Sequence, residues 1–154
     1  MALLQARPPA TYAEWSELLD KFRKKEDSDE EILATMQSGT IAWQTGVAER
    51  FSQKLIGAVN FRMNSAIDKF QKDMSRSSGQ ERAIIQALLL LRKEFAFLYQ
   101  AISLPVIPEK DRASYSALVR GQADKTQCAL EESARKDRTG KLASLLRNNR
   151  VNNF

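Results

Sequence analysis

The most apolar stretch of the chain is residues 83–102, AIIQALLLLRKEFAFLYQAI, which is interrupted by charge at residues 92–94 alone. Its uncharged beginning, 83–91, is nine residues long, whereas a bilayer-spanning helix needs about 20 apolar residues. Apolar residues occur on every side of the projected helix, which is typical of a helix that packs on most of its circumference. We therefore expect a buried helix here, started by a capping box at Ser78–Glu81 and ended by Pro105 and Pro108.

Two shorter helices are predicted before this stretch. Capping-box sequences begin at Thr11 and at Ser28, each with a glutamate three residues later. The second of these helices is expected to end at Gly39. Both boxes precede apolar residues at helical spacing, so the pattern favours a helical pair at this end of the chain.

The longest helical pattern covers residues 41–76, where apolar side chains fall on one face when each residue advances 100°. Within it, Gly46 is expected to mark a break and Gly57 a close helix contact, because glycine in a helix interior costs about 1 kcal/mol relative to alanine. A further pattern, Asp111–Arg135, has many alanines at its packing positions. Cys128 lies near that face and is expected to be a small buried side chain.

These patterns predict an all-α bundle of about four to five helices with the apolar helix 83–102 at its centre. Six glycines and four prolines leave little material for the many turns of an all-β fold. We expect an extended N-terminal arm over residues 1–10, a bundle domain over 11–135 and a basic C-terminal segment over 136–154. That segment is predicted to form a short amphipathic helix after Gly140 and then an irregular tail.

The chain contains no histidine and one cysteine. Histidine is the commonest general base and the commonest transition-metal ligand, so its absence removes Ser/His and Cys/His nucleophile pairs. A structural zinc site and a ferritin-like di-iron site are also excluded in practice. The acidic cluster at residues 26–31 lacks EF-hand spacing and is interpreted as a solvated helix start. We therefore expect no enzyme, no cofactor and no metal site.

A single cysteine cannot form an intramolecular disulfide, and residues 1–12 lack a basic region followed by a long apolar region. These features favour a cytoplasmic protein without integral membrane insertion.

Two basic features stand out from this background. Within the 41–76 pattern, six cations fall in a sector of about 120° and span about 39 Å at 1.5 Å per residue. They are Arg50, Lys54, Arg62, Lys69, Lys72 and Arg76. The second feature is the end of the chain, where six cations face one carboxylate, Asp137, and this excess equals the formal charge of the whole chain, +5. Its cations are Arg135, Lys136, Arg138, Lys141, Arg147 and Arg150.

Aligned Lys and Arg side chains can follow phosphates and release their counterions. The leading interpretation is therefore a non-enzymatic accessory module that binds RNA or DNA electrostatically within a larger nucleoprotein assembly. The cations of the long helix have another interpretation, a solvated face or one that pairs with the acidic N-terminal helices. The last segment is alternatively a helix that closes the bundle or one that lies on a membrane surface.

Two other function classes stay open. One is a protein-interaction adaptor, assembly chaperone or inhibitor with an apolar helical interface, which Phe95, Phe97 and Tyr99 would form toward another protein or a second copy of the chain. The other is a helix-turn-helix DNA-binding regulator within residues 32–49, with Gly39 in its turn.

Overall fold

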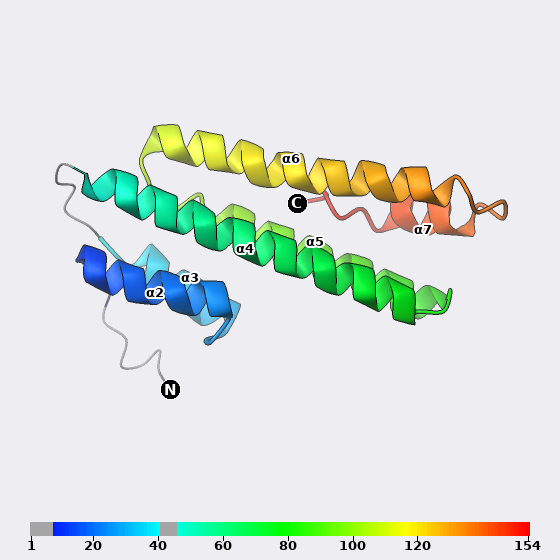
Figure 1. Cartoon of the computed structure of the whole chain (residues 1–154), viewed down its shortest axis with the longest axis horizontal. Helices are drawn as coiled ribbons and strands as arrows, with labels where there is room; N and C mark the ends of the chain where they lie inside the picture. The colour runs from blue at the N-terminus through cyan, green and yellow to red at the C-terminus, as the bar shows by residue number, and fades with distance from the viewer. Residues whose placement is uncertain (1–7, 41–45) are drawn as a thin grey trace. The chain divides into compact units, whose positions relative to one another are not determined.

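The computed structural model describes residues 8–40 and 46–154, and within them the chain forms six helices and no strand (Figure 1). The helices are α2 (Tyr12–Lys24), α3 (Asp29–Gln37), α4 (Val47–Arg76), α5 (Glu81–Ala101), α6 (Glu109–Ala134) and α7 (Lys141–Asn148). The predicted all-α bundle is confirmed. The first part of the predicted N-terminal arm, 1–7, and the first residues of the predicted 41–76 helix, 41–45, lie outside the described residues.

The chain divides into two compact units. Unit 1 comprises Met1–Arg62 and Gln100–Ser116, and unit 2 comprises Met63–Tyr99 and Ala117–Phe154. The boundary between them falls within the three long helices α4, α5 and α6. Each unit is described by itself below.

In unit 1, both predicted capping boxes form and set the first turns of α2 and α3. Thr11 Oγ1 accepts a hydrogen bond from the Glu14 backbone N–H at 3.2 Å, and Ser28 Oγ accepts one from Glu31 N–H at 3.2 Å. Each satisfies a backbone donor that the helix itself leaves free. The two helices pack against each other and bury a large aromatic and aliphatic core, which includes Trp15, Leu19, Phe22, Ile32 and Met36.

Trp15 anchors the segment that follows α3. Its ring is fully buried, meets Phe51 edge to face at 5.2 Å, and donates from Nε1 to the Thr40 carbonyl at 2.8 Å. Thr40 N–H in turn donates to the Pro9 carbonyl at 2.8 Å. A Cβ on Gly39 would lie 2.5 Å from Trp15 Cζ2 and 2.7 Å from Pro9 Cγ. No larger residue fits between these two rings, which explains why the position just beyond α3 is a glycine.

The glycines near and within α4 differ from each other. Gly46, with φ of 84°, directly precedes the first residue of α4, so its left-handed backbone marks the start of the helix. The predicted close contact at Gly57 is wrong, because a Cβ there would meet no atom of the described residues within 4 Å. Alanine would therefore fit at this position.

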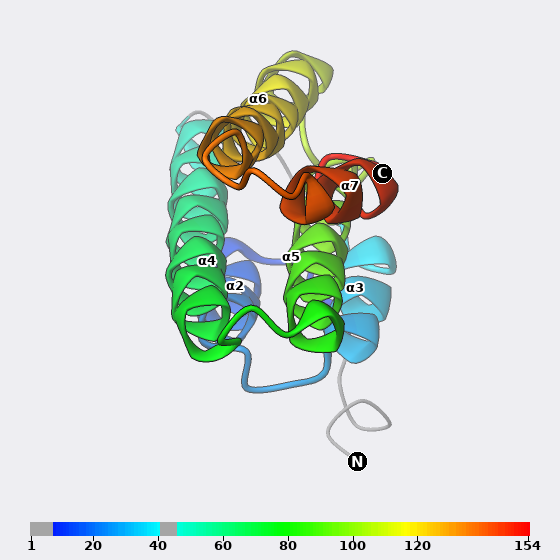
Figure 2. The ribbon, with the colours of Figure 1, turned by 90° about the vertical axis from the view of Figure 1, so that its right-hand side faces the viewer.

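In unit 2, a short turn joins α4 to α5 at the end of the unit that faces the viewer in Figure 2. Ser78 lies in this turn with φ of 51°, and α5 begins at Glu81. The predicted capping box at Ser78 is therefore wrong, since it requires the helix to begin directly after Ser78. The backbone turns there through two consecutive left-handed residues, Ser78 and Gly79.

The expected burial of the apolar helix holds for one broad face of α5. Ile84, Leu88, Leu91, Phe95 and Leu98 are each at most 7% exposed. Leu89 and Leu90 are 36% and 46% exposed, so the prediction that this helix packs on most of its circumference is corrected at these two leucines. The periodicity did not reveal this, because an all-round apolar pattern carries no information about which sector a neighbour covers.

The end of the chain docks on unit 2. After α7, Val151 is fully buried, and its N–H donates at 3.0 Å to Oε1 of Gln127, a side chain of α6 that is 1% exposed. The ring of Phe154 stacks on Phe95 at 6.3 Å between centroids. Val151 and Phe154 thus anchor the end of the chain on unit 2.

The expectation that Cys128 is buried is wrong, because this residue of α6 is exposed. Gln127, directly before it, turns inward instead and serves both α7 and the following segment. One step along a helix rotates a side chain by about 100°, so the inward position of Gln127 places Cys128 away from the interior.

Candidate nucleic-acid interface

The predicted row of cations on α4 falls into two groups of different character. Arg50, Lys54 and Arg62 belong to unit 1, whereas Lys69, Lys72 and Arg76 belong to unit 2. The unit 1 group is engaged by α2 and α3. Arg50 lies over the Tyr12 ring at 5.9 Å, and Lys54 donates to Ser16 Oγ at 2.6 Å and pairs with Asp20 at 3.2 Å.

Arg62 is part of the core, with 2% of its surface exposed. Its guanidinium donates to the Phe22 carbonyl at 3.3 Å, pairs with Asp29 at 3.1 Å, and lies over the Phe22 ring at 4.9 Å. A side chain held in this way cannot reach a phosphate outside the protein. Its function in the structure is to join α4 to the C-terminal half of α2 and the first turn of α3.

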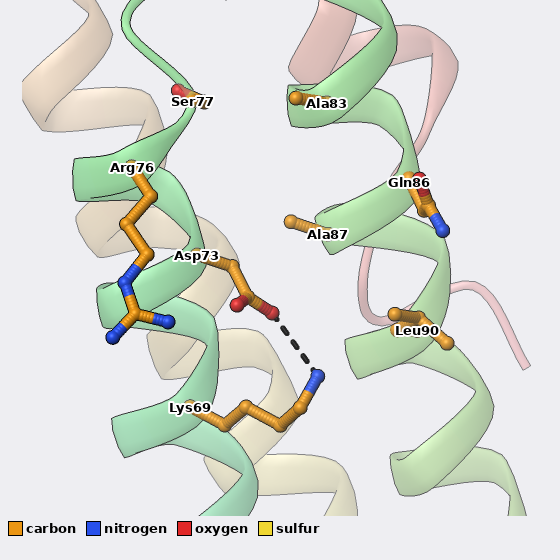
Figure 3. A pocket seen from close by; sticks show the side chains of 8 residues that line it. All are labelled: Lys69, Asp73, Arg76, Ser77, Ala83, Gln86, Ala87 and Leu90. Carbon is orange, nitrogen blue, oxygen red and sulfur yellow. Dashed lines mark hydrogen bonds and ion pairs between the residues drawn. The ribbon is translucent and has the colours of Figure 1, made fainter.

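The unit 2 group of α4 lies on the surface. Lys69 forms an exposed ion pair with Asp73 at 3.1 Å, and both side chains extend from α4 toward Leu90 of α5 (Figure 3). They line a hollow of about 320 Å³ to which Arg76 also contributes. Lys72 and Arg76 are exposed, and neither forms an ion pair with any described residue. These two side chains are available to an external anion.

The cations at the end of the chain also lie on unit 2. Arg135, Lys136, Arg138, Lys141 and Arg147 are exposed. Arg150 differs from them, because it pairs with Glu131 at 3.5 Å and donates to Asn152 Oδ1 at 3.2 Å. In Figure 1 the turn after α6, which carries Arg135–Arg138, lies at the same end of unit 2 as the turn after α4. The exposed cations of α4 and of this turn therefore share one end of the unit.

The turn itself is built around Asp137. Its carboxylate accepts hydrogen bonds from the backbone N–H groups of Leu142 and Thr139, both at 3.1 Å, and from Thr139 Oγ1 at 2.8 Å. The Leu142 N–H is the largest of the effects that lower the pKa of Asp137 below its ordinary value of 3.8. The single carboxylate among these cations is therefore occupied in capping α7 and is a weak competitor for an external ligand.

Charge separates sharply between the units. Unit 2 contains fourteen Lys and Arg against eight Asp and Glu, a formal charge of +6, whereas unit 1 contains ten against eleven, a charge of −1. A polyanion would therefore be attracted to unit 2 and not to unit 1.

A second hollow in unit 2 was not foreseen from the sequence. A groove of about 560 Å³ runs between α4 and α6, with Ile67, Phe70, Met74 and Leu130 among its apolar lining and Lys125 among its polar lining. A neighbouring hollow on α4 shares Gln71 and Ser75 with it and is also lined by Lys72 and Arg76. The sequence did not indicate this groove, because its α6 wall depends on which helix lies opposite α4.

The predicted partner interface is covered by the chain itself. Phe95 and Phe97 are 1% and 7% exposed. Tyr99 meets the Phe154 ring at 5.6 Å, and Arg120 lies over that ring at 4.1 Å. The exposed apolar surface of α5 is instead formed by Leu89 and Leu90.

The turn proposed for a helix-turn-helix falls partly on residues 41–45, which lie outside the described residues. Gly39, expected in that turn, packs against Trp15.

Within the described ranges 8–40 and 46–154, no three acidic or cysteine side chains gather closely enough to hold a metal ion. Over the same ranges, no helix has the length and apolarity needed to cross a bilayer. Comparisons of the chain with protein-family models, with curated proteins and with solved structures found no match.

Proposed function

We propose that the protein is a non-enzymatic module that binds RNA or DNA through its phosphates, using the exposed cations of unit 2. The observation that carries this proposal is the charge of +6 on unit 2 beside −1 on unit 1. Lys72 and Arg76 of α4, with the turn after α6, form the proposed contact surface. Neutralised phosphates release condensed counterions, so such a surface binds without reading base sequence.

The contacts of the other cations on α4 limit which residues can form the proposed contact surface. Arg62 is buried, and Lys54 pairs with Asp20, so neither belongs to the proposed contact surface. The surface comprises the exposed side chains Lys72, Arg76, Arg135, Lys136, Arg138, Lys141 and Arg147.

Fluorescence anisotropy with labelled RNA and DNA oligonucleotides, as single strands and as duplexes, tests this proposal. We expect binding at low salt that weakens linearly on a plot of log affinity against log salt concentration. Negligible affinity at low salt for every member of the panel, or affinity without a salt slope, would refute the proposal.

A protein-interaction module is the second candidate, and the exposed Leu89 and Leu90 favour it. These adjacent leucines lie on α5, and Leu90 also lines the hollow that contains the Lys69–Asp73 pair. A protein complex formed through this patch would survive high salt and would be lost with a double Leu89→Ser, Leu90→Ser variant. Binding to nucleic acid would instead be lost at high salt and would persist in the double leucine variant.

A further inference from the structure

We propose that the groove between α4 and α6 receives unpaired bases, so that the ligand of unit 2 is single-stranded nucleic acid and not a duplex. This inference rests on the proposed function, because it names the form of nucleic acid that the same cations bind. It goes further in assigning a role to the groove, which phosphate contacts alone do not require.

The size of the groove suits such a ligand. Its volume of about 560 Å³ lies within the range of about 300–1,000 Å³ that is typical of ligand sites. On α6 its lining runs from Gln122 to Ser133, which corresponds to roughly 16 Å of helix at 1.5 Å per residue. That length accommodates more than one base, given about 3.4 Å per stacked nucleotide.

The chemistry of the lining also suits bases. The apolar side chains of Ile67, Met74 and Leu130 can contact the face of a base once it is unstacked. The uncharged polar groups of the lining are Gln71 and Ser75 on α4 and Gln122, Thr126 and Ser133 on α6. A glutamine amide offers both donors and an acceptor, which matches the mixed pattern along a base edge. Among the residues that the structure describes, no carboxylate lines this groove.

Cations flank the groove on both helices. Lys125 belongs to the α6 wall, whereas Lys72 and Arg76 line the adjoining hollow on α4, together with Asp68. None of these three cations forms an ion pair with another residue in the described part of the chain. A strand whose bases enter the groove would therefore find positive charge for its phosphates on either side.

A duplex cannot use this arrangement, because its bases are stacked and paired and its surface presents mainly phosphates. A flat basic surface would bind single strands and duplexes alike. An apolar groove lined also by amide and hydroxyl groups adds affinity only for unpaired bases. An acidic amphipathic helix would also find an apolar floor here. The cations on both sides, however, favour a ligand that carries negative charge along its whole length.

The test compares a labelled 12-nucleotide single strand with a duplex of the same length, at one salt concentration. We expect the single strand to bind at least about tenfold more tightly, because only unpaired bases can enter the groove. Ala129→Glu places a carboxylate in the groove and should weaken single-strand binding about tenfold, with duplex binding reduced much less. Ala117→Glu adds the same charge at an exposed position of α6 outside the groove and should change single-strand binding less than about twofold.

Equal or tighter duplex binding, or no difference between the two glutamate variants, would overturn this inference while leaving the proposed function intact. Negligible binding of both forms would overturn the two proposals together. Displacement of the labelled single strand by an acidic amphipathic peptide at a lower concentration than the unlabelled single strand requires would assign the groove to a protein helix instead. Circular dichroism melting of each variant confirms that a change in affinity is measured on folded protein.

Discussion

The guanidinium of Arg62 lies 3.1 Å from the carboxylate of Asp29, and Arg62 is 2% exposed whereas the Asp29 side chain is 27% exposed. A cation from the middle of α4 is thus neutralised by the first residue of α3. Removal of the carboxylate would take this ion pair away from a buried charge, and the Phe22 carbonyl at 3.3 Å, a neutral acceptor, would not replace it.

We therefore predict that Asp29→Asn lowers the free energy of unfolding by about 1.5–3 kcal/mol, the range for hydrogen bonds to charged groups. Urea denaturation followed by circular dichroism measures this change. Glu30→Gln is the matched control, because it removes a charge from the same first turn of α3 at an exposed residue. Equal losses in the two variants would mean that the interaction with the helix dipole, and not the pair with Arg62, explains the effect.

Two glycine substitutions should have opposite effects on stability. Gly39→Ala brings a Cβ within 2.5 Å of Trp15 and 2.7 Å of Pro9, so it should destabilise the protein by about 1–3 kcal/mol, the usual cost of overpacking. Gly57→Ala meets nothing within 4 Å inside α4 and should stabilise by about 0.5–1 kcal/mol. Thermal melting of both variants checks the signs, and a melting temperature that rises for Gly39→Ala would refute the close packing around Trp15.

The docking of the last residues on unit 2 predicts a measurable role for Phe154. Phe154→Ala removes ring contacts with Phe95 and Tyr99, and with the Arg120 guanidinium, so we expect a loss of about 2 kcal/mol in the free energy of unfolding. Asn153→Ala, at the exposed neighbouring residue, should change it by less than about 0.5 kcal/mol. If both variants unfold at the urea concentration of the unchanged protein, residues 149–154 do not contribute to the stability of unit 2.

The capping of α7 by Asp137 predicts a pH dependence at low pH. Because hydrogen bonds from Leu142 and Thr139 lower the pKa of Asp137, the folded state favours the carboxylate form. This contribution to stability is present above the ordinary pKa of 3.8 and is lost as the pH falls below it toward the folded-state value.

Urea denaturation at a series of pH values from 5 downward measures this loss. Asp137→Asn should be less stable than the unchanged protein at pH 5, and the difference should shrink below pH 3.8. Asp68→Asn, at an exposed carboxylate without a hydrogen bond to a described residue, is the matched control for the loss of one negative charge. A constant difference between the unchanged protein and Asp137→Asn at every pH would contradict the capping role of the carboxylate.

The local features of the fold were predictable from the sequence because their causes are local. The capping boxes at Thr11 and Ser28 each connect residues three positions apart, and both form as predicted. The box at Ser78 failed although its sequence is equivalent. There the chain must reverse between α4 and α5, and two left-handed residues satisfy that requirement where a cap would not.

The candidate site was less predictable because it depends on distant residues. In the helical pattern of the sequence, Arg62 and Lys72 fall in the same sector of cations. In the structure, however, Arg62 is buried and pairs with Asp29, which is thirty-three residues away. The predictions of a close contact at Gly57 and of a buried Cys128 were wrong for the same reason. Only the neighbouring helices decide which face of a helix is covered. The groove between α4 and α6 could not be predicted, because the sequence does not show which two helices face each other.

The function proposed for the protein is phosphate binding by the exposed cations of unit 2. The decisive measurement is the affinity of a labelled single strand for three proteins over a range of salt concentrations: the unchanged chain, Lys72→Glu with Arg76→Glu, and Lys21→Glu with Lys24→Glu. Both variants reverse two exposed cations and carry the same net charge, but the first changes unit 2 and the second changes α2 of unit 1. We predict at least about a tenfold loss of affinity and a shallower salt slope for the unit 2 variant, and a loss below about threefold for the unit 1 variant. Equal losses in the two variants, or unchanged affinity in the first, would contradict phosphate binding by the cations of unit 2.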